Sequence, residues 1–433
     1  MKYQAVVADG LSVPPGALLL WPGQNLRTGE VGFAEAFGEI TTLESDALRL
    51  ASSIYPCDLA FKRGEREEII RTIELEVPVV NYQIFKSLTA EIELALWNLS
   101  DDNWTVRFKR AAGASEPARA WPAKKGKTIL FSGGLDSFAG AVELLEQSSP
   151  EAVHLASHVT GNRVTRQSQS DLYEYLCSSL GKPRWTAVRT GGRKAAQADF
   201  PADQEREDSQ RTRSFMFLMI AALAARRSGH HELVMIAENG QMAIHLPLSP
   251  ARTGAFSTHT AHPEFVRRMA IIISDLLDVQ FSVENPYLYM TKAEVVARVA
   301  QRHGAALAGA VSCWRSARPG SSRHCGECVP CLIRRIALEK NGINLNEYAR
   351  NLLAENIPDL PEMDSGKRNL VELIELAHSF ASNSDAALEQ AFPDLTNEDI
   401  DLSEAIGMYR RFAVEATDVL GRYSGAAALM SAT

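Results

Sequence analysis

Two short stretches of the sequence hold residue types that could do chemistry. The first, SGGLDS at residues 132–137, follows an apolar run and precedes a segment with helical spacing. Glycines let a backbone turn tightly and approach a ligand, and free N–H groups at the start of a helix attract anions. The sequence therefore predicts a phosphate-binding turn, called the phosphate turn below, made of Ser132, Gly133, Gly134, Leu135, Asp136 and Ser137.

Asp136 does not fit a plain phosphate site. A carboxylate that points inward repels phosphate, unless it caps the helix or helps to hold Mg²⁺. A structural glycine turn with Asp136 as the helix cap therefore stays open as an alternative. The stretch is not a Walker A loop, which needs a Lys-Ser/Thr pair after the second glycine, and it is not G-x-G-x-x-G.

The second stretch is a cluster of cysteines late in the chain. Cys-x2-Cys spacing lets two thiolates bind one ion, and four thiolates are typical of a structural zinc site. An iron–sulfur cluster is the main alternative, followed by a redox pair and by buried apolar cysteines. His324 lies next to the cluster and could compete as a ligand. The predicted zinc ligands are Cys313, Cys325, Cys328 and Cys331.

Composition sets the broad class of protein. The chain has 433 residues, of which 45% are hydrophobic and 23% charged, which is ordinary for a soluble protein of two or three domains. A net charge of −8 argues against free nucleic acid as a partner. The longest apolar run, residues 215–225, is shorter than the roughly 20 residues of a membrane span and predicts a buried helix instead. The start of the chain does not resemble a signal peptide, so we expect a cytoplasmic location.

Three regions can be distinguished along the chain. Residues 1–124 are predicted to form a β-rich accessory domain with strands at 71–80, 87–99 and 103–110 and a helix at 44–61. Residues 111–127 are rich in Ala, Pro and Lys and are typical of a linker. Residues 341–433 are predicted to be mainly helical.

The middle region, residues 125–340, alternates short apolar runs with longer helical patterns. Strands are expected at 127–133, 151–159, 184–190, 232–240 and 279–287, and helices at 137–147, 169–181, 214–229 and 291–304. This alternation predicts an α/β fold in which helices cover both faces of a parallel sheet. Ligands then bind at the carboxyl ends of the strands.

The phosphate turn resembles the PP-loop of ATP pyrophosphatases, which split ATP between its α and β phosphates. Together with the cysteine cluster, it makes residues 127–337 similar to the QueC family of 7-cyano-7-deazaguanine synthases. Matching stretches, in order, are VTGNRVTRQS (159–168), RTRSFMFLMIAALAA (211–225), AENG (237–240), HPEF (262–265), MTKAEVV (290–296) and CGECVPCLIR (325–334). The resemblance implies a parallel five-stranded sheet of the PP-loop/adenine nucleotide α-hydrolase type with a structural zinc.

The resemblance also implies an activity and roles for residues. In that family, ATP adenylates the carboxylate of 7-carboxy-7-deazaguanine, ammonia displaces AMP, and a second ATP dehydrates the amide to a nitrile. We expect ATP, Mg²⁺ and Zn²⁺ as cofactors. Asp136, Arg213 and Lys292 are the candidates for catalysis, Gly161 and Asn162 for the adenine side, and Glu238, Asn239, His262 and Arg334 for the substrate. The alternative for Arg213 and Lys292 is a solvated charge at a helix end.

The sequence departs from the family in three ways. Regions are added at both ends, Ser214 stands where the family has asparagine, and His262 stands where it has arginine. Enlarged QueC-like proteins occur in anti-phage defence operons, including those called Qat. We therefore expect the activated deazaguanine to pass to an amine on a partner protein that contacts residues 1–124. The alternatives are a housekeeping synthase of queuosine biosynthesis, a tRNA-modifying PP-loop enzyme and a non-enzymatic nucleotide-binding protein.

Overall fold

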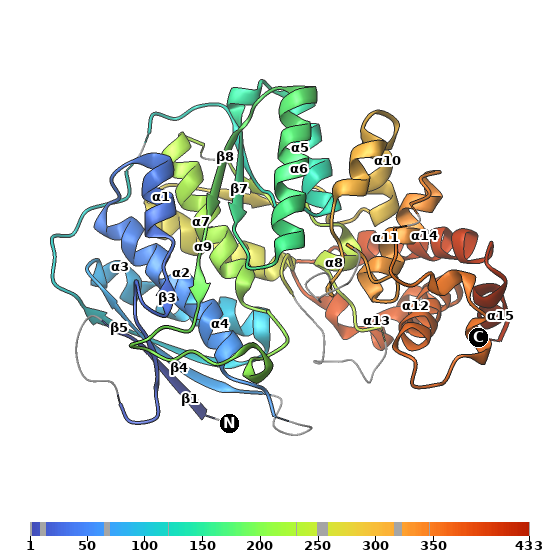
Figure 1. Cartoon of the computed structure of the whole chain (residues 1–433), viewed down its shortest axis with the longest axis horizontal. Coiled ribbons are helices and arrows are strands. Elements are labelled where there is room, and N and C mark those ends of the chain that lie inside the picture. The colour runs from blue at the N-terminus through green and yellow to red at the C-terminus, as the bar shows by residue number, and fades with distance from the viewer. Residues whose placement is uncertain are drawn as a thin grey trace.

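The computed structural model describes residues 2–8, 14–64, 70–119, 121–230, 232–248, 259–315, 323–345 and 347–432. Figure 1 shows the N-terminal region (blue) on one side of the molecule and the C-terminal helices (orange and red) on the other. The middle of the chain, drawn in green and yellow, lies between them and holds the central sheet.

The central sheet has five strands in the order β11-β10-β6-β7-β8, and all of its pairings are parallel. Strand β6, the first of them along the chain, lies in the middle. The chain runs from β6 to one side and later returns to the other, so a ligand crevice is expected where β6 and β10 end. The predicted parallel α/β architecture is confirmed. The strands are β6 (Lys127–Leu130), β7 (Val153–His158), β8 (Arg184–Val188), β10 (Glu232–Met235) and β11 (Ser282–Glu284).

Helices cover both faces of this sheet. On one face, α5 (Leu135–Gln147) packs against α6 (Arg163–Leu180) and α10 (Lys292–His303). On the other face lie α7 (Arg213–Ser228) and α9 (Pro263–Leu277). Helix α7 contains the long apolar run and is buried along most of its length, as predicted. Within the described ranges, no helix combines the length and apolarity that crossing a membrane requires.

The N-terminal region is a mixed α/β unit, so the prediction of a β-rich region is wrong. It has a second parallel sheet, in the order β2-β1-β4-β5, and four described helices. A short antiparallel pair of β3 with β9 (Gly191–Gly192) joins this region to the middle of the chain. The elements are β1 (Lys2–Val7), β2 (Leu18–Leu20), β3 (Leu26–Arg27), α1 (Glu30–Phe37), α2 (Thr42–Ala60), β4 (Thr72–Val79), α3 (Tyr82–Ser87), α4 (Thr89–Ser100) and β5 (Asn103–Arg110).

The strand predicted at residues 87–99 is the main error in this region. These residues form α3 and α4 because their buried positions follow the helical period. Ile92, Leu96 and Leu99 face the core, whereas Leu94 and Trp97 are 42% and 50% exposed. The alternation of glutamate with apolar residues fits both periods over a few positions, and only packing against α9 distinguishes them.

The N-terminal and central regions share one hydrophobic cluster. Helix α2 packs on α7 and α4 packs on α9, so two pairs of helices lie between the two sheets. A buried ion pair crosses this contact: Arg227 Nε lies 2.6 Å from Glu44 Oε1, and both side chains are 1% exposed. The residue bounds of the three regions stay a prediction, but the contact between the first two resembles a protein interior.

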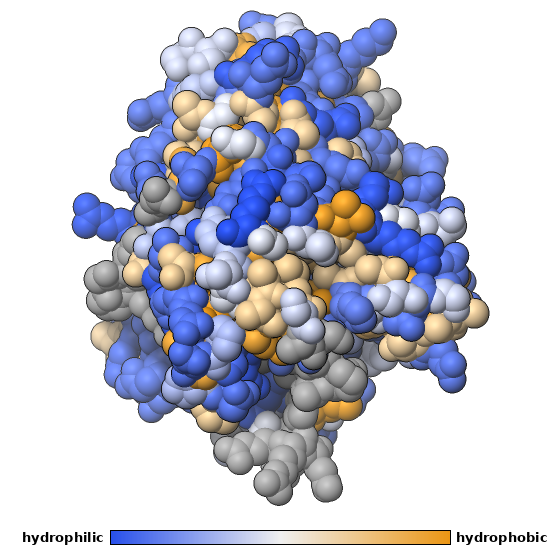
Figure 2. Space-filling view, turned by 90° about the vertical axis from the view of Figure 1, so that its right-hand side faces the viewer, coloured by the Kyte–Doolittle hydropathy of each residue, from blue (hydrophilic) through white to orange (hydrophobic). Residues whose placement is uncertain are grey.

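The C-terminal region is helical, as predicted. Its helices α12 and α14 pack on each other, and α14 also packs on α11 (Val329–Lys340), which carries the last cysteine of the cluster. Figure 2 looks onto this side of the molecule, where polar residues surround an apolar area near the centre. The remaining helices are α8 (Gly240–Ala243), α12 (Ser365–Ser382), α13 (Asp385–Ala391), α14 (Leu402–Leu420) and α15 (Ser424–Ala432).

The buried His154 predicts how stability depends on pH. Its ring nitrogens lie 2.9 Å from Thr186 Oγ1 and 2.8 Å from Ser228 Oγ, and burial lowers its pKa from 6.5 to about 3. Below pH 6.5, His154 therefore binds a proton in the unfolded chain but stays neutral in the folded chain. Between pH 7.5 and 5.5 this histidine should remove about 1.4 kcal/mol from the free energy of unfolding.

Urea unfolding of the wild type and of His154→Gln across that pH range checks this expectation. The variant should be less stable at pH 7.5 but should lose less stability towards pH 5.5. Equal pH slopes in the two proteins would show that His154 does not carry the effect.

Candidate functional site

The phosphate turn lies between the end of β6 and the start of α5. Gly133 has a φ of +80°, which favours glycine, and a Cβ there would meet Gln169 Cγ at 3.0 Å. Ser137 Oγ lies 3.1 Å from Ser132 Oγ and 3.0 Å from the carbonyl oxygen of Gly134, so the hydroxyls fold inside the turn. Gly134 occupies the N-cap position of α5. Asp136 is therefore not the helix cap, so that part of the alternative is wrong, while phosphate binding by the turn stays a prediction.

Asp136 instead contacts two other predicted site residues, Lys292 and Asn239. Lys292 Nζ lies 3.0 and 2.8 Å from the two carboxylate oxygens of Asp136, and Asn239 Nδ2 donates to Oδ2 at 2.7 Å. All three side chains are buried. They come from the starts of α5 and α10 and from the segment after β10, which is the edge where the crevice was expected. The alternative of Lys292 as a solvated charge is wrong.

Asn239 also offers an oxygen with nothing bound to it. Its Nδ2 faces Asp136, while its Oδ1 is buried and has no hydrogen-bond partner within the described ranges. A buried carbonyl oxygen without a donor is costly, because it loses its hydrogen bonds to water. The site therefore has a place for a ligand that donates a hydrogen bond.

Glu238 extends this group of charges. Burial, and then the negative charge of Asp136, raise the pKa of Glu238 to about 8. At neutral pH the side chain is therefore largely protonated and adds no negative charge to a site predicted to receive phosphate. Asn285 fixes the Glu238 backbone from both sides, at 3.3 Å to its N–H and 2.8 Å to its carbonyl oxygen.

Arg213 lies near this group without contacting Asp136 within the described ranges. It is the first residue of α7, and its Nη1 donates to Gln210 Oε1 at 3.1 Å. Its positive charge lowers the pKa of Glu238, although burial and Asp136 outweigh it. Arg213 therefore stands at the same edge of the sheet, and its catalytic role stays a prediction.

The C-terminal region supports the helix that carries Lys292. Thr291 caps α10 in a capping box with Glu294, and Thr291 Oγ1 also donates to Glu415 Oε1 at 2.8 Å. Arg411 Nε donates to Glu294 Oε1 at 2.7 Å. Both Arg411 and Glu415 belong to α14, so this helix holds the start of α10 in place. The sequence alone assigned no function to the C-terminal region.

Other predicted binding residues have structural roles in the described contacts. Asn162 caps α6 by accepting the N–H groups of Val164 and Thr165, at 2.9 and 3.4 Å, and Gly161 precedes it in the loop after β7. His262 caps α9 by accepting the N–H of Glu264 at 3.3 Å. Burial lowers the pKa of His262 to about 4, so this side chain is neutral at pH 7.

Arg334 is buried on α11, and its Nη2 donates to the carbonyl oxygen of Leu307 at 2.9 Å. Its Nη1 has no partner within the described ranges, and burial lowers its pKa. No described contact links Arg334 to Asp136. Its predicted role in substrate binding stays untested, while the structure gives it a second task, which is to hold the segment around Leu307.

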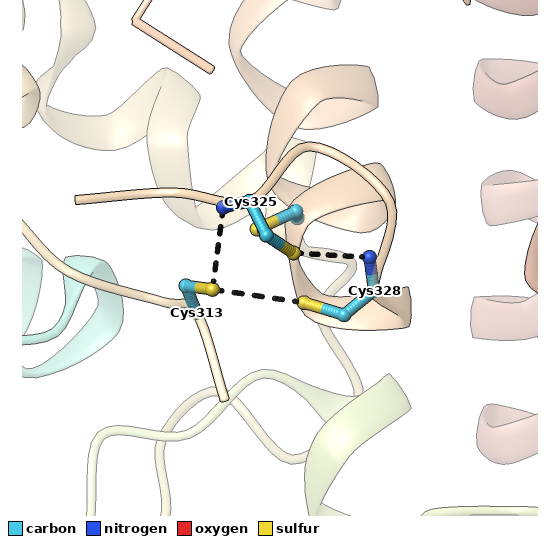
Figure 3. Close-up of side chains that lie close together, drawn as sticks. Cys313, Cys325 and Cys328 are labelled. Atoms are coloured by element: carbon cyan, nitrogen blue, oxygen red, sulfur yellow. Dashed lines mark hydrogen bonds between the residues drawn. The ribbon is translucent and has the colours of Figure 1, made fainter. Parts of the chain in front are cut away.

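The four predicted cysteines come together. Their sulfur atoms all lie within 4.8 Å of one another, with 3.9 Å between Cys325 and Cys331 and 4.0 Å between Cys313 and Cys328. Backbone N–H groups of Cys325 and Cys328 donate to sulfurs at 3.4 Å, as Figure 3 shows.

A zinc ion with Zn–S bonds of about 2.3 Å places tetrahedral sulfurs about 3.8 Å apart, so the cluster fits one such ion. His324 is not part of the cluster, since its Nε2 accepts the N–H of Ser312 at 3.4 Å.

We expect purified protein to hold about one zinc per chain. Cys328→Ser should reduce the zinc content and lower the free energy of unfolding by a few kcal/mol, because binding of a structural metal contributes directly to folding. Elemental analysis and thermal unfolding measure both effects. Cys177→Ser, on α6 and outside the cluster, is the control and should keep its zinc. Iron with sulfide in fresh protein would contradict the assignment.

Sequence reasoning missed two residues that hold the phosphate turn. Ser168 Oγ lies 2.8 Å from the carbonyl oxygen of Gly133, and the N–H of Val311 donates to the same oxygen at 3.0 Å. A single serine or valine belongs to no motif that could be recognised in a sequence. Their roles depend on contacts between segments far apart in the chain.

The arrangement can bind and orient a polyanion. The phosphate turn offers N–H groups at a helix start, and Lys292 places a buried positive charge beside them. Asn239 and Glu238 offer hydrogen-bonding groups at the same edge. No cysteine outside the metal cluster lies among these residues, so the described geometry does not favour sulfur transfer.

The comparisons with known proteins agree with this geometry. A family described as "Queuosine biosynthesis protein QueC" matches residues 127–342. A 7-cyano-7-deazaguanine synthase of Brucella anthropi is 25% identical over 227 residues, which cover 50% of this chain and 89% of that protein. The enzymes of the same name from Brucella canis and Brucella suis are each 25% identical over 228 residues, covering 50% of this chain and 90% of theirs. The chain thus belongs, through its residues 127–342, to the QueC family.

Proposed function

We propose that the protein uses ATP to activate the carboxylate of 7-carboxy-7-deazaguanine as an acyl adenylate, and then transfers the acyl group to an amine. The observation that carries this proposal is the buried group of Asp136, Lys292 and Asn239 beside the phosphate turn. In a member of the QueC family, this group would provide a site for an anion and a site for the base at one edge of the sheet.

Each residue would contribute a separate part of the chemistry. A carboxylate is a poor electrophile, because its oxygen is a poor leaving group, and transfer of AMP to that oxygen makes it a good one. The turn amides and Lys292 would neutralise and align the phosphates. Asn239 Oδ1 would accept an N–H group of the deazaguanine. Mg²⁺ prefers oxygen ligands, and the Asp136 carboxylate supplies them next to the expected phosphate position.

We further propose that the amine belongs to a partner protein in an anti-phage defence system. The support is the presence of two folded regions beyond the 127–342 match, which free ammonia as acceptor would not require. The outer face of the N-terminal sheet carries Lys2, Arg107 and Lys109, which are 69%, 62% and 65% exposed and could contact such a partner.

The second candidate function is synthesis of free 7-cyano-7-deazaguanine from ammonia. The activity after which the Brucella relatives are named favours it. Mass spectrometry of reactions with ATP, 7-carboxy-7-deazaguanine and either ammonium or co-expressed neighbouring proteins separates the two. A deazaguanine-sized adduct on a protein, absent in the Asp136→Asn variant, supports conjugation. An unmodified protein beside free nitrile product supports the synthase instead.

The partner contact has its own test. Arg107→Glu reverses a charge on the exposed sheet face and should reduce transfer to the partner while AMP formation with hydroxylamine as acceptor stays unchanged. Arg302→Glu reverses a comparably exposed charge on α10, where Arg302 is 62% exposed and pairs with Glu146, and is the matched control. Equal transfer of the acyl group by the wild type, the Arg107→Glu variant and the control variant would exclude this face as the partner site.

A further inference from the structure

The phosphate turn is tied directly to the segment that leads into the metal site. The carbonyl oxygen of Gly133, the glycine with φ +80°, accepts the N–H of Val311 at 3.0 Å. Only Ser312 separates Val311 from Cys313, the first cysteine of the metal cluster. The position of Cys313 therefore constrains the backbone that supports the turn.

Ser168 makes a second tie between the turn and this segment. It is fully buried on α6, and its hydroxyl lies 2.8 Å from the carbonyl oxygen of Gly133 and 2.7 Å from that of Gly309. A hydroxyl has one proton, so Ser168 donates to one of the two carbonyl oxygens at a time. Its position between them holds Gly133 and Gly309 near each other. Gly309 O also accepts Arg323 Nη1 at 3.0 Å, and Arg323 lies two residues before Cys325.

The metal side holds the other end of the same segment. Leu307 O accepts Arg334 Nη2 at 2.9 Å, and Arg334 follows Cys331 by three residues on α11. The Ser312 N–H donates to His324 Nε2 at 3.4 Å, and His324 is next to Cys325. Residues 307–313 are called the coupling segment below. Residues next to the cysteines hold this segment in place, and the segment itself supports the phosphate turn.

We propose that the metal site and the nucleotide site are energetically coupled through the coupling segment, so that a bound metal ion pre-positions the phosphate turn. The proposal rests on the proposed function in taking a nucleotide as the ligand of the turn. Without the ion, the four cysteines are no longer held together. Part of the nucleotide's binding free energy must then order the segment and the turn.

Because coupling of binding free energies acts in both directions, it can be followed from the nucleotide site and from the metal site. The first measurement is the affinity of the full-length protein for an ATP analogue with a methylene group between the α and β phosphates, which cannot be split there. Removing the metal should raise the Kd about tenfold, equivalent to about 1.4 kcal/mol. The second is the rate of zinc release to a chromogenic chelator, which saturating analogue should slow. The second measurement starts from folded protein and so remains informative if the metal-free chain unfolds.

Ser168→Ala tests the route of the coupling. The variant should keep its zinc and its thermal stability within a few degrees, bind the analogue about fivefold more weakly, and show less protection of zinc by the analogue. Ser178→Ala is the matched control: it lies on the same helix, is exposed, and its hydroxyl donates to the carbonyl oxygen of Tyr175 at 2.9 Å. It should behave as the wild type does.

The outcomes separate this inference from the function it rests on. Zinc release that is equally fast with and without bound analogue overturns the coupling and leaves the nucleotide site intact. Protection of zinc that is unchanged in Ser168→Ala overturns the route through Ser168. Zinc-loaded wild type that binds no analogue overturns the nucleotide site itself.

Discussion

Replacing Arg227 with methionine is expected to lower the free energy of unfolding by about 3–5 kcal/mol. The substitution leaves the Glu44 carboxylate buried without its ionic partner, since Arg227 Nε and Nη2 lie 2.6 and 2.7 Å from its two oxygens. Arg227 Nη2 also donates to the carbonyl oxygen of Glu39 at 2.6 Å. Because the pair crosses from α2 to α7, the loss should appear in the unfolding of both regions together.

Arg119→Met is the control for this prediction. Arg119 pairs with Glu39 at 2.8 Å, but the two side chains are 48% and 80% exposed, so its removal should leave the free energy of unfolding almost unchanged. Urea unfolding followed by tryptophan fluorescence and by circular dichroism measures both variants. A separate, earlier transition of the N-terminal region would contradict the view that the two regions share one core.

Because the N-terminal and central regions share one hydrophobic core, deletion of the N-terminal region is not a suitable test of partner binding. Deleting residues 1–124 would remove α2 and α4 from α7 and α9 and expose the apolar surface of α7. A truncated protein would then lose adenylation because it unfolds, so the loss would say nothing about binding of a partner. Substitutions on the exposed sheet face, such as Arg107→Glu, avoid this problem.

Replacing Lys292 with methionine should reduce AMP formation by about 10²–10³-fold, because it removes the buried positive charge that would face the phosphates. The variant should also be less stable, since the buried carboxylate of Asp136 loses its ionic partner and keeps hydrogen bonds such as those from Asn239. Quantifying AMP by chromatography, alongside thermal unfolding, measures the two effects.

The double variant Asp136→Asn/Lys292→Met separates the two effects. Removing both charges should recover part of the lost stability, because no buried carboxylate is left unpaired, while activity stays low. Activity that returns together with stability would show that Lys292 is structural and does not act on the phosphates.

The sequence predicted those parts of the fold and site that depend on local pattern. The strand–turn–helix at Ser132–Ser137 and the four cysteines could be found because short spacing defines them. The helix at residues 44–61 was found, as α2, but α4 was missed, because Ile92 and Leu96 fit a strand as well as a helix until packing on α9 is known. The contact of Asp136 with Lys292 joins residues 156 positions apart, so the sequence suggested each residue but not the pair.

The central claim is that ATP is split between its α and β phosphates to activate a carboxylate, and product analysis tests it most directly. Purified protein should be incubated with Mg²⁺, ATP labelled at the α phosphate, 7-carboxy-7-deazaguanine and hydroxylamine as the amine acceptor, and the nucleotide products and pyrophosphate measured together. We expect AMP and pyrophosphate in equal amounts, dependent on the carboxylate substrate and lost in Lys292→Met. ADP with orthophosphate as products, or AMP formation that does not depend on the carboxylate substrate, would contradict the central claim.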